Sequence, residues 1–200
     1  PDTHYYDLLA SEARLASFFA IAKGDVPPEH WFHLGRPLRR VEGGAMLISW
    51  NGSMFEYLMP RLLLKPDTGT LLGESERMVV DVQERYGRAQ SVPWGISESA
   101  YSARDPEHRY RYQGFGVPEL GLKRGLSRDM VVAPYATALA LAVAPKKAVA
   151  NLRLLTRSGG SGRYGLVEAL DFTPERSPGS GPRTVNAYMA HHQGMLLSAI

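Results

Sequence analysis

The sequence contains no cysteine, and that absence removes several kinds of chemistry. Disulfide frameworks, thiolate metal sites and cysteine nucleophiles are all excluded. A long apolar run is also missing, because the longest stretch without a charged residue, 130–145, is shorter than the roughly 20 residues that span a bilayer. We therefore predict a core helix there, no membrane span in this chain and no signal peptide at its start.

Charge of one sign is not concentrated anywhere in the chain. Lys and Arg number 23 against 20 Asp and Glu, and the resulting net charge of +3 is spread along the sequence. This pattern gives little support for nucleic acid as a partner. A length of 200 residues with 44% hydrophobic residues is typical of one globular domain. Both ends fall next to helical patterns without stop signals, so residues 1–200 are predicted to be a single, truncated domain.

Strand-like alternation is scarce, with short candidates only at 46–50 and 109–115. Helical spacing is common, and Ser53 with Glu56 forms a capping-box pattern at one helix start. Pro145 suits the first turn of another helix. The sequence therefore predicts a mainly α fold, with helices at 3–22, 53–64, 74–86, 130–144, 145–157 and from about 184 onward.

Long segments rich in Gly, Pro, Ser, Tyr or Trp separate these helices, at 43–51, 88–126 and 158–183. Loops of that length in a compact domain are usually functional or disordered, and their aromatic content argues against disorder. We expect them to form the working face. Helical hairpins that carry long aromatic loops on one side are typical of an α/α toroid, and a helical bundle is the alternative.

One carboxylate interrupts the apolar face of the first predicted helix. Glu12 shares that face with Tyr5, Leu8, Leu15, Ala16 and Phe19. Burial of an unpaired charge is costly, so such a group moves to the surface, finds a partner or serves chemistry. Glu12 is therefore either a candidate catalytic residue or a carboxylate paired with Arg14 or another cation.

A second carboxylate, Glu98, lies in a loop-like run between Trp94 and Tyr101. Aromatic residues with Gly and Ser are typical of sugar-binding clefts, although a solvated loop glutamate is the simpler interpretation. Glu56 is left out of the catalytic set because the capping box accounts for it. The pair of Glu12 and Glu98 would supply the two carboxylates that glycosidic bond cleavage requires.

Other residues have two readings each. His191 and His192 are adjacent, so on a helix they point about 100° apart and do not suit one metal ion. They either bind sugar hydroxyls or are satisfied core histidines. Glu168 and Asp171 form a third carboxylate cluster, which is a helix-end pair or part of a cleft. The Gly- and Ser-rich run 158–162 is interpreted as a linker and not as a phosphate loop.

Several motifs together resemble one known family, the glycoamylase-like domain of cyclic β-1,2-glucan synthases, related to endo-β-1,2-glucanases. They keep the family's order over essentially the whole chain and read YYDLLASEAR at 5–14, SWNGSMFEYLMP at 49–60, WGISES at 94–99, LDFT at 170–173 and MAHHQGM at 189–195. The resemblance implies an (α/α)6 barrel, of which this chain is a part. It also implies a large bacterial inner-membrane protein with glycosyltransferase and phosphorylase-like modules, in which this soluble part lies on the cytoplasmic side.

The resemblance further implies transglycosylation that closes linear β-1,2-glucan into a ring. Glu98 is then expected to be the nucleophile and Glu12 the general acid/base of a retaining mechanism, without cofactor or metal. An inverting β-1,2-glucanase and a non-catalytic glucan-binding module are the alternatives. The expected substrate-binding residues are Tyr5, Trp50, Trp94, Tyr101, Asp171, His191, His192 and Gln193.

Overall fold

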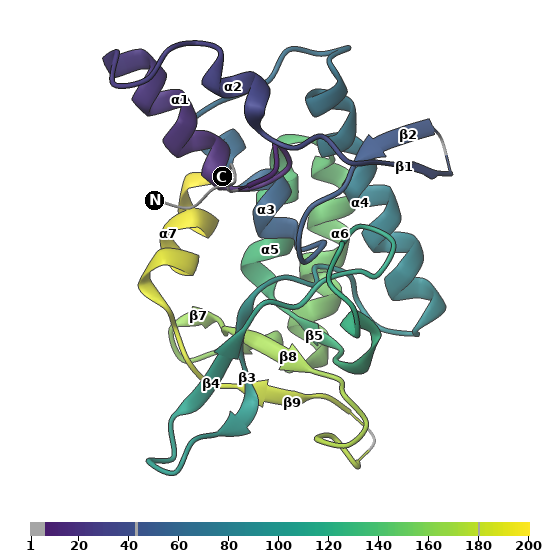
Figure 1. Cartoon of the computed structure of the whole chain (residues 1–200). Coiled ribbons are helices and arrows are strands. Elements are labelled where there is room, and N and C mark those ends of the chain that lie inside the picture. Colours follow the sequence, from purple (N-terminus) through teal and green to yellow (C-terminus); the bar gives the residue numbers. More distant parts are fainter. Residues whose placement is uncertain (1–6, 43, 180) are drawn as a thin grey trace.

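Helices occupy the centre and one end of the molecule, and most of the short strands gather at the other end, while the hairpin at 38–47 lies beside the long helix at 71–89 (Figure 1). The computed structural model describes residues 7–42, 44–179 and 181–200. Its α-helices are α1 (Ala13–Lys23), α2 (His30–His33), α3 (Met54–Leu58), α4 (Leu71–Ala89), α5 (Pro134–Leu139), α6 (Pro145–Leu155) and α7 (Ala190–Ser198). Single turns of 3-10 helix are η1 (Pro60–Leu62), η2 (Leu126–Arg128) and η3 (Ala140–Ala142), and η4 (Thr156–Gly160) is a π-helical turn.

The strands form small antiparallel sheets. They are β1 (Leu38–Val41), β2 (Gly44–Leu47), β3 (Ser99–Arg104), β4 (Tyr110–Gln113), β5 (Val131–Val132), β6 (Ser161–Gly162), β7 (Gly165–Leu166), β8 (Ala169–Asp171) and β9 (Arg183–Val185). Three pairs form two-stranded sheets, β1 with β2, β3 with β4 and β6 with β7, while β8 lies between β5 and β9 in a three-stranded sheet. Val131 faces Asp171 in that sheet, and Asp171 faces Arg183.

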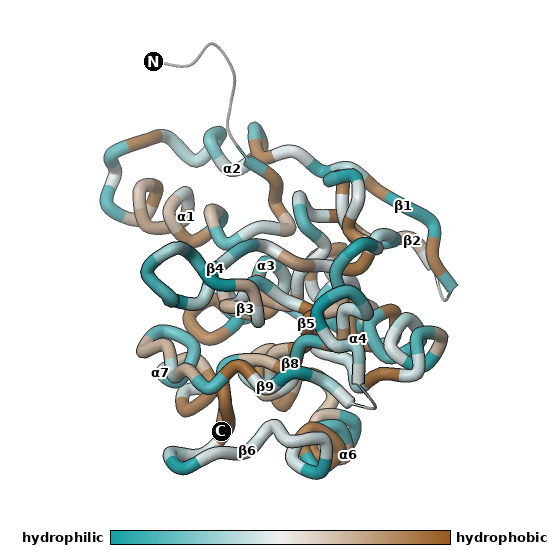
Figure 2. Tube along the Cα trace, turned by 90° about the horizontal axis from the view of Figure 1, so that it is seen from below, coloured by the Kyte–Doolittle hydropathy of each residue, from teal (hydrophilic) through white to brown (hydrophobic). Residues whose placement is uncertain are grey.

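The core is built where α3, α4, α5 and α6 pack together, with α7 against α5. Polar and apolar residues alternate along α4 and α6 (Figure 2), so each helix has a face to bury. Val79 and Val80 of α4 and Tyr57 of α3 are fully buried there. Complete burial of a large apolar side chain stabilises a fold by about 1.5–3 kcal/mol. This packing fixes the ends of the elements from which the candidate site projects.

The capping and proline signals are confirmed. The Ser53 hydroxyl accepts from the Glu56 backbone N–H while the Glu56 carboxylate accepts from the Ser53 backbone N–H. Pro145 occupies the first turn of α6, and α4 covers the predicted helix 74–86 and extends beyond it at both ends. The predicted helix 53–64 is shorter, because Pro60 ends α3 and begins the turn η1.

The predicted helix over 3–22 is confirmed from Ala13 onward, but its described start and its apolar stripe are wrong. The helix α1 begins at Ala13, because Leu8 and Leu9 instead form a bridge and a hydrogen bond with Gly35. The buried residues of α1 are Arg14 and Ser17, while Phe19 is 53% exposed. Glu12 therefore sits at the helix N-cap and not inside an apolar face.

Two further boundaries differ from the predictions. In the predicted helix 130–144, Val131 and Val132 pair with β8, and the helix starts only at Pro134, whose missing N–H suits a first turn. The last helix starts at Ala190, because Arg183–Val185 pairs with β8 as strand β9. Pairing between distant segments overrides the local helical spacing at both places.

The segments predicted as long loops contain much of the sheet structure. Segment 88–126 includes the β3–β4 hairpin, and segment 158–183 includes β6, β7 and β8. The fold is therefore more mixed than the mainly α prediction, and within the described ranges the helices do not close into a ring. None of the helices in those ranges is both long and apolar enough to cross a membrane.

Candidate active site

Glu12 lies at the start of α1, half buried, with the Ser11 hydroxyl 3.3 Å from its Oε2. Burial raises the pKa of Glu12 above the ordinary value. The negative charges of Glu56, Glu98 and Asp7 raise it further. A glutamate with a raised pKa keeps its proton to higher pH, which is the property that a general acid near neutral pH requires.

Glu98 lies between the turn at Trp94 and strand β3. Its Oε1 accepts a 2.6 Å hydrogen bond from the Tyr112 hydroxyl, and its backbone carbonyl accepts one of 2.8 Å from the hydroxyl of Tyr135. The charge of Glu98, after that of Glu56, is among those that raise the pKa of Glu12, so the two carboxylates lie within electrostatic reach of each other. Glu12 is the N-cap residue of α1, and Glu98 directly precedes strand β3.

Tyr112 is a residue of this site that sequence reasoning did not select. It lies on β4, which the β3–β4 hairpin folds back beside Glu98. Burial, then the hydrogen bond to Glu98 and the charge of Glu98, raise the pKa of Tyr112 well above its usual value. Tyr112 is therefore a hydrogen-bond donor at any working pH. Its signal in the sequence is the alternation of Arg and Tyr at 109–112.

Asp7 is the second residue that was missed, although it lies within the motif at 5–14. It is 8% exposed, and its Oδ1 accepts from the Trp50 indole N–H at 3.2 Å and from the Leu8 backbone N–H at 2.6 Å. Its φ of 118° falls in a region that non-glycine residues rarely adopt and that is concentrated at functional sites. Asp7 thereby fixes Trp50, whose ring is 43% exposed beside the carboxylates.

Glu56 supports the backbone segment that carries Trp50. Besides its part in the capping box, its carboxylate accepts from the backbone N–H groups of Trp50 and Asn51, each at 3.0 Å, and from the Ser49 hydroxyl at 2.9 Å. These bonds hold the backbone that carries Trp50. Glu56 therefore has a structural explanation, as its capping position predicts.

His192 is fully buried and does not face a cleft. Its Nδ1 is 2.8 Å from Glu168 Oε1, and its Nε2 is 3.4 Å from the Tyr112 hydroxyl. The Tyr135 ring stacks on it with 3.7 Å between centroids. The core-histidine interpretation is correct for His192, whereas its neighbour His191 is exposed and lines a cavity. Burial and then His192 lower the pKa of His191.

Other predicted sugar-binding residues are engaged in contacts within the protein. Trp94 is 6% exposed and packs in the core, and Tyr101 is 7% exposed with the Arg176 guanidinium 4.9 Å above its ring. Asp171 is fully buried and accepts from Arg176 and Ser102. These contacts explain all three residues without a ligand. Gln193, half buried, donates to the Leu166 carbonyl. Tyr5 lies outside the described residues.

The alternative that Arg14 pairs with Glu12 is not what the structure shows. The Arg14 guanidinium turns inward and pairs with Glu76 Oε1 at 3.0 Å. It also donates to the carbonyls of Glu56 and Tyr57. Across the described parts of the chain, no ion pair joins Glu12, Glu98 or Asp7 to a cation. Among the described residues these carboxylates are therefore not neutralised by a direct ion pair, and Arg14 acts on Glu12 only through its charge.

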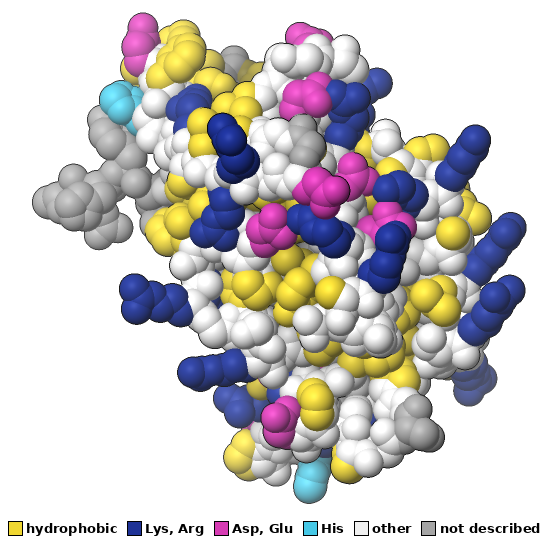
Figure 3. Space-filling model, turned by 90° about the vertical axis from the view of Figure 1, so that its right-hand side faces the viewer, with side chains coloured by type: hydrophobic (Ala, Val, Ile, Leu, Met, Phe, Trp, Pro, Cys, Tyr) yellow, Lys and Arg dark blue, Asp and Glu magenta, His cyan; other side chains and the backbone are white. Residues whose placement is uncertain are grey.

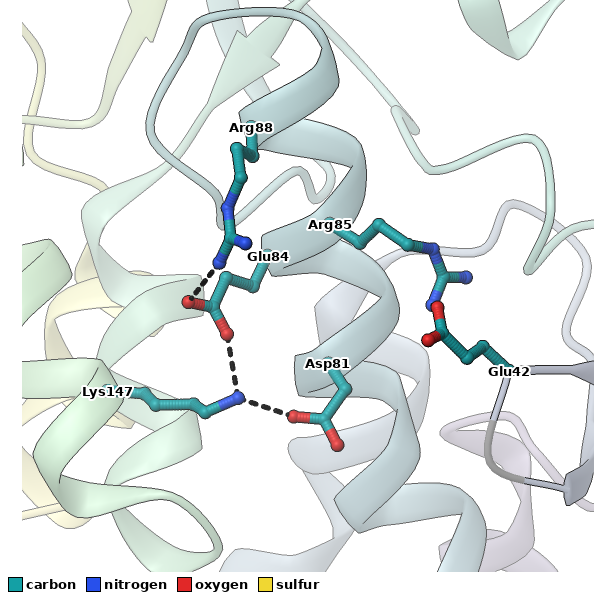
Figure 4. A pocket seen from close by; sticks show the side chains of 6 residues that line it. All are labelled: Glu42, Asp81, Glu84, Arg85, Arg88 and Lys147. Atoms are coloured by element: carbon teal, nitrogen blue, oxygen red, sulfur yellow. Dashed lines mark hydrogen bonds and ion pairs between the residues drawn. The ribbon is translucent and has the colours of Figure 1, made fainter.

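A separate charged cavity of about 400 Å³ lies along α4, lined by Glu42, Asp81, Glu84, Arg85, Arg88 and Lys147 (Figure 4). Lys147 of α6 bonds to Asp81 and Glu84, each at 2.7 Å, so these charges neutralise one another and tie α6 to α4. Acids and bases are intermingled in the same way on the face that Figure 3 shows. None of the candidate residues lines this cavity. Among the described residues, no group of three or more His, Asp and Glu is arranged to hold a metal ion.

Two carboxylates that share one site are the machinery of enzymes that cleave or transfer glycosidic bonds. Homology places the chain in that class, the carbohydrate-active enzymes of glycosyl hydrolase or transferase type. Residues 4–200 match the glycoamylase family, described as "Putative glucoamylase", and the chain belongs to this family. The resemblance to a glycoamylase-like domain is thereby confirmed.

The relatives link the family to β-1,2-glucan. Over all 200 residues the chain is 52% identical to cyclic beta-(1,2)-glucan synthase NdvB of Rhizobium meliloti (strain 1021), and it spans 7% of that protein's length. The chain also resembles the structure of a "putative glucoamylase" from Bacteroides caccae, with a TM-score of 0.65 and 19% identity, covering 98% of this chain and 48% of that one. An endo-beta-1,2-glucanase from Chitinophaga pinensis gives a TM-score of 0.57 and 16% identity, covering 87% and 43%. These two structures show a shared fold.

Proposed function

We propose that this chain carries the catalytic carboxylates of a β-1,2-glucan transglycosylase, with Glu98 as nucleophile and Glu12 as general acid/base. The observation that carries the proposal is the placement of two carboxylates: Glu98 is held by the Tyr112 hydroxyl at 2.6 Å, and Glu12 is half buried at the start of α1. Burial, and then the charges of Glu56, Glu98 and Asp7, raise the pKa of Glu12. Two carboxylates with different environments are the usual way to obtain one acid and one base at a single pH. The 52% identity to a cyclic beta-(1,2)-glucan synthase supports β-1,2-glucan as substrate.

The first step breaks the glycosidic bond. Glu12 gives its proton to the glycosidic oxygen, and a Glu98 carboxylate oxygen attacks the anomeric carbon. The bond between that carbon and the leaving oxygen breaks, and a glycosyl ester to Glu98 forms. The Tyr112 hydroxyl, 2.6 Å from Oε1 of Glu98, would hold the other carboxylate oxygen toward the sugar.

The second step returns the enzyme to its starting state. Glu12, now ionised, takes the proton from a sugar hydroxyl at the far end of the same glucan chain, and that oxygen attacks the anomeric carbon. The ester bond to Glu98 breaks and the ring closes with retained configuration. Water in place of that hydroxyl would give hydrolysis.

The substrate contacts follow from exposure. Trp50 presents a partly exposed ring fixed by Asp7, which suits stacking on a pyranose ring, and His191 with Gln193 on α7 offers polar groups. Trp94, Tyr101, Asp171 and His192 are buried, so we assign them to support of the site. Contact by Tyr5 stays a prediction.

A hydrolase is the second candidate, because the structural neighbours include endo-beta-1,2-glucanases. An inverting enzyme would place water between the carboxylates and separate them by roughly 6.5–9.5 Å, against about 5–5.5 Å for retention. A non-catalytic glucan-binding module is less well supported, since it gives no reason for uncompensated carboxylates to converge.

The wider context is part of the proposal. The fold of the relatives supports an (α/α)6 toroid, of which this chain would form one part as a single truncated domain. By resemblance, the whole protein would join this domain to glycosyltransferase and phosphorylase-like modules at a bacterial inner membrane, with the domain on the cytoplasmic side. The 7% share of the synthase relative leaves room for such modules.

The test replaces each glutamate by glutamine in the full-length enzyme. Glu12→Gln and Glu98→Gln should each lower turnover of linear β-1,2-glucan about 10²- to 10⁴-fold, because one proton donor or one nucleophile is lost. Glu175→Gln, an exposed control, should retain full activity. Near-normal turnover in either site variant would remove that residue from the mechanism. Product analysis by NMR then separates cyclic from linear products and retained from inverted configuration.

A further inference from the structure

The hydrogen bonds behind Glu98 run in one continuous chain into the core. The Tyr112 hydroxyl contacts Glu98 Oε1 at 2.6 Å and His192 Nε2 at 3.4 Å. His192 Nδ1 then lies 2.8 Å from Oε1 of Glu168, a residue 1% exposed in the turn before β8. We propose that Glu168 and His192 are positioning residues that act through Tyr112 to orient the Glu98 carboxylate. This inference rests on the proposed role of Glu98.

The direction of the chain follows from counting protons. Tyr112 has one hydroxyl hydrogen, and its short contact to Glu98 uses it. Nε2 of His192 can bond to the same hydroxyl oxygen only by donating its own N–H. Nδ1 faces the Glu168 carboxylate at 2.8 Å, and the carboxylate oxygen accepts from Nδ1 when that nitrogen carries a proton. A ring without a proton on Nε2 would instead present a lone pair to Tyr112 and compete with Glu98 for the hydroxyl hydrogen.

The surroundings of His192 keep the ring in one orientation. Tyr135 of α5 stacks on it at 3.7 Å with an interplanar angle of 9°, and the same tyrosine donates to the Glu98 backbone carbonyl. The ring of His191 lies 4.0 Å away between centroids, and burial lowers the pKa of His191. The side chain and the backbone of Glu98 are therefore both fixed by groups that contact His192.

Only one oxygen of the Glu168 carboxylate has hydrogen-bond partners among the described residues. Its Oε1 accepts from the Ala100 backbone N–H at 3.0 Å as well as facing His192, while the buried Oε2 has no hydrogen-bond partner among the described residues. An unsatisfied buried oxygen costs free energy that a purely structural pair would not need to bear. A carboxylate held for its charge on His192 explains why the position is not filled by an amide or an apolar residue.

The experiment is a double-mutant cycle in the full-length enzyme, with linear β-1,2-glucan as substrate. Tyr112→Phe removes one hydroxyl and keeps the ring, so kcat should fall roughly ten- to hundredfold while KM stays within about twofold, because the contact concerns Glu98 and not sugar binding. Glu168→Gln should lower kcat by a similar factor. The double variant should lose no more than Tyr112→Phe alone, because both changes remove the same alignment.

Controls separate positioning from folding. Tyr110→Phe removes the same atom from the same strand and should leave kcat unchanged, and the melting temperature of each variant should match that of the parent. Losses that multiply in the double variant would overturn the inference. If Glu168→Gln does not fold, Tyr112→Phe decides alone, since an unchanged kcat and pH profile would contradict the inference.

The same measurements distinguish this inference from the proposed function. If Glu98→Gln is inactive while Tyr112→Phe and Glu168→Gln behave as wild type, the positioning role is wrong and the catalytic role of Glu98 stands. If Glu98→Gln retains normal turnover, the proposed function is wrong, and the positioning role with it.

Discussion

Glu12 and Arg14 are two residues apart, yet the charged groups around them are organised in opposite ways. Arg14 points inward to Glu76, which also pairs with Arg61 at 2.7 Å, so each buried charge meets an opposite one. The charges of Glu56, Glu98 and Asp7 act on Glu12, and among the described residues no ion pair joins Glu12, Glu98 or Asp7 to a cation. The closed cluster, Arg14, Glu76 and Arg61, holds α1, η1 and α4 together. The open cluster, Glu12, Glu98 and Asp7, collects like charges that the stability of the fold does not require.

The contrast between these two groups of charges indicates which residues serve stability and which serve function. Burial lowers the pKa of Arg14 to about 10, which still leaves the guanidinium charged at neutral pH. The charge of Arg14 therefore serves the stability of the fold. Uncompensated carboxylates destabilise a fold, and proteins retain such groups mainly where chemistry needs them. Breaking the closed cluster should therefore damage stability, and relieving the open one should damage activity.

The largest effect on stability is expected from Glu76→Ala. The change strands the fully buried Arg14 guanidinium, and loss of one partner of a buried ion pair typically costs about 3–5 kcal/mol. Chemical denaturation should show this loss in the free energy of unfolding. Glu74→Ala removes a surface partner of Arg77 on the same helix and should cost less than about 1 kcal/mol. Equal losses for the two variants would show that the inner cluster is not special.

Glu12→Gln should have the opposite profile, with activity lost and the free energy of unfolding within about 1 kcal/mol of wild type. The folded pKa of Glu12 is raised, so its contribution to stability is present below the unfolded pKa and is lost as pH rises through the folded pKa. At neutral pH Glu12→Gln should be at least as stable as wild type. Its advantage over wild type in the free energy of unfolding should be larger at neutral pH than at pH 4. A clear destabilisation at neutral pH would mean that Glu12 is structural.

Local signals in the sequence predicted part of this arrangement. The capping box at Ser53 and the proline at the start of α6 depend on residues a few positions apart, and both are confirmed. The prediction of a helix through Leu8 is wrong because Leu8 instead pairs with Gly35, which lies far along the chain. Glu12 and Glu98 were selected from a pattern and a family resemblance. Their supports, Tyr112 and Glu168, depend on the β3–β4 hairpin and on packing of α7, which local spacing does not encode.

A smaller effect is expected from Asp7→Asn, which changes the charge of the open cluster without removing its contacts. Asparagine keeps an oxygen that can accept from the Trp50 indole N–H but removes one negative charge near Glu12. The pKa of Glu12 should fall, so the alkaline loss of kcat/KM should begin at a lower pH than in wild type. Asp25→Asn, an exposed change, should leave that limb in place. A limb that does not move would mean that another group controls it.

The smallest net effect on stability is expected from Asp7→Gly, because two contributions oppose each other. Glycine accepts a φ of 118° freely and relieves about 1–3 kcal/mol of backbone strain, while the lost hydrogen bonds remove about 0.5–1.5 kcal/mol each. The unfolding free energy should therefore change little, but KM should rise because Trp50 loses its anchor. Ser91→Gly relieves a positive φ remote from the site and should leave KM unchanged. If Asp7→Gly unfolds the protein and Ser91→Gly does not, Asp7 belongs with the structural carboxylates, and the open cluster reduces to Glu12 and Glu98.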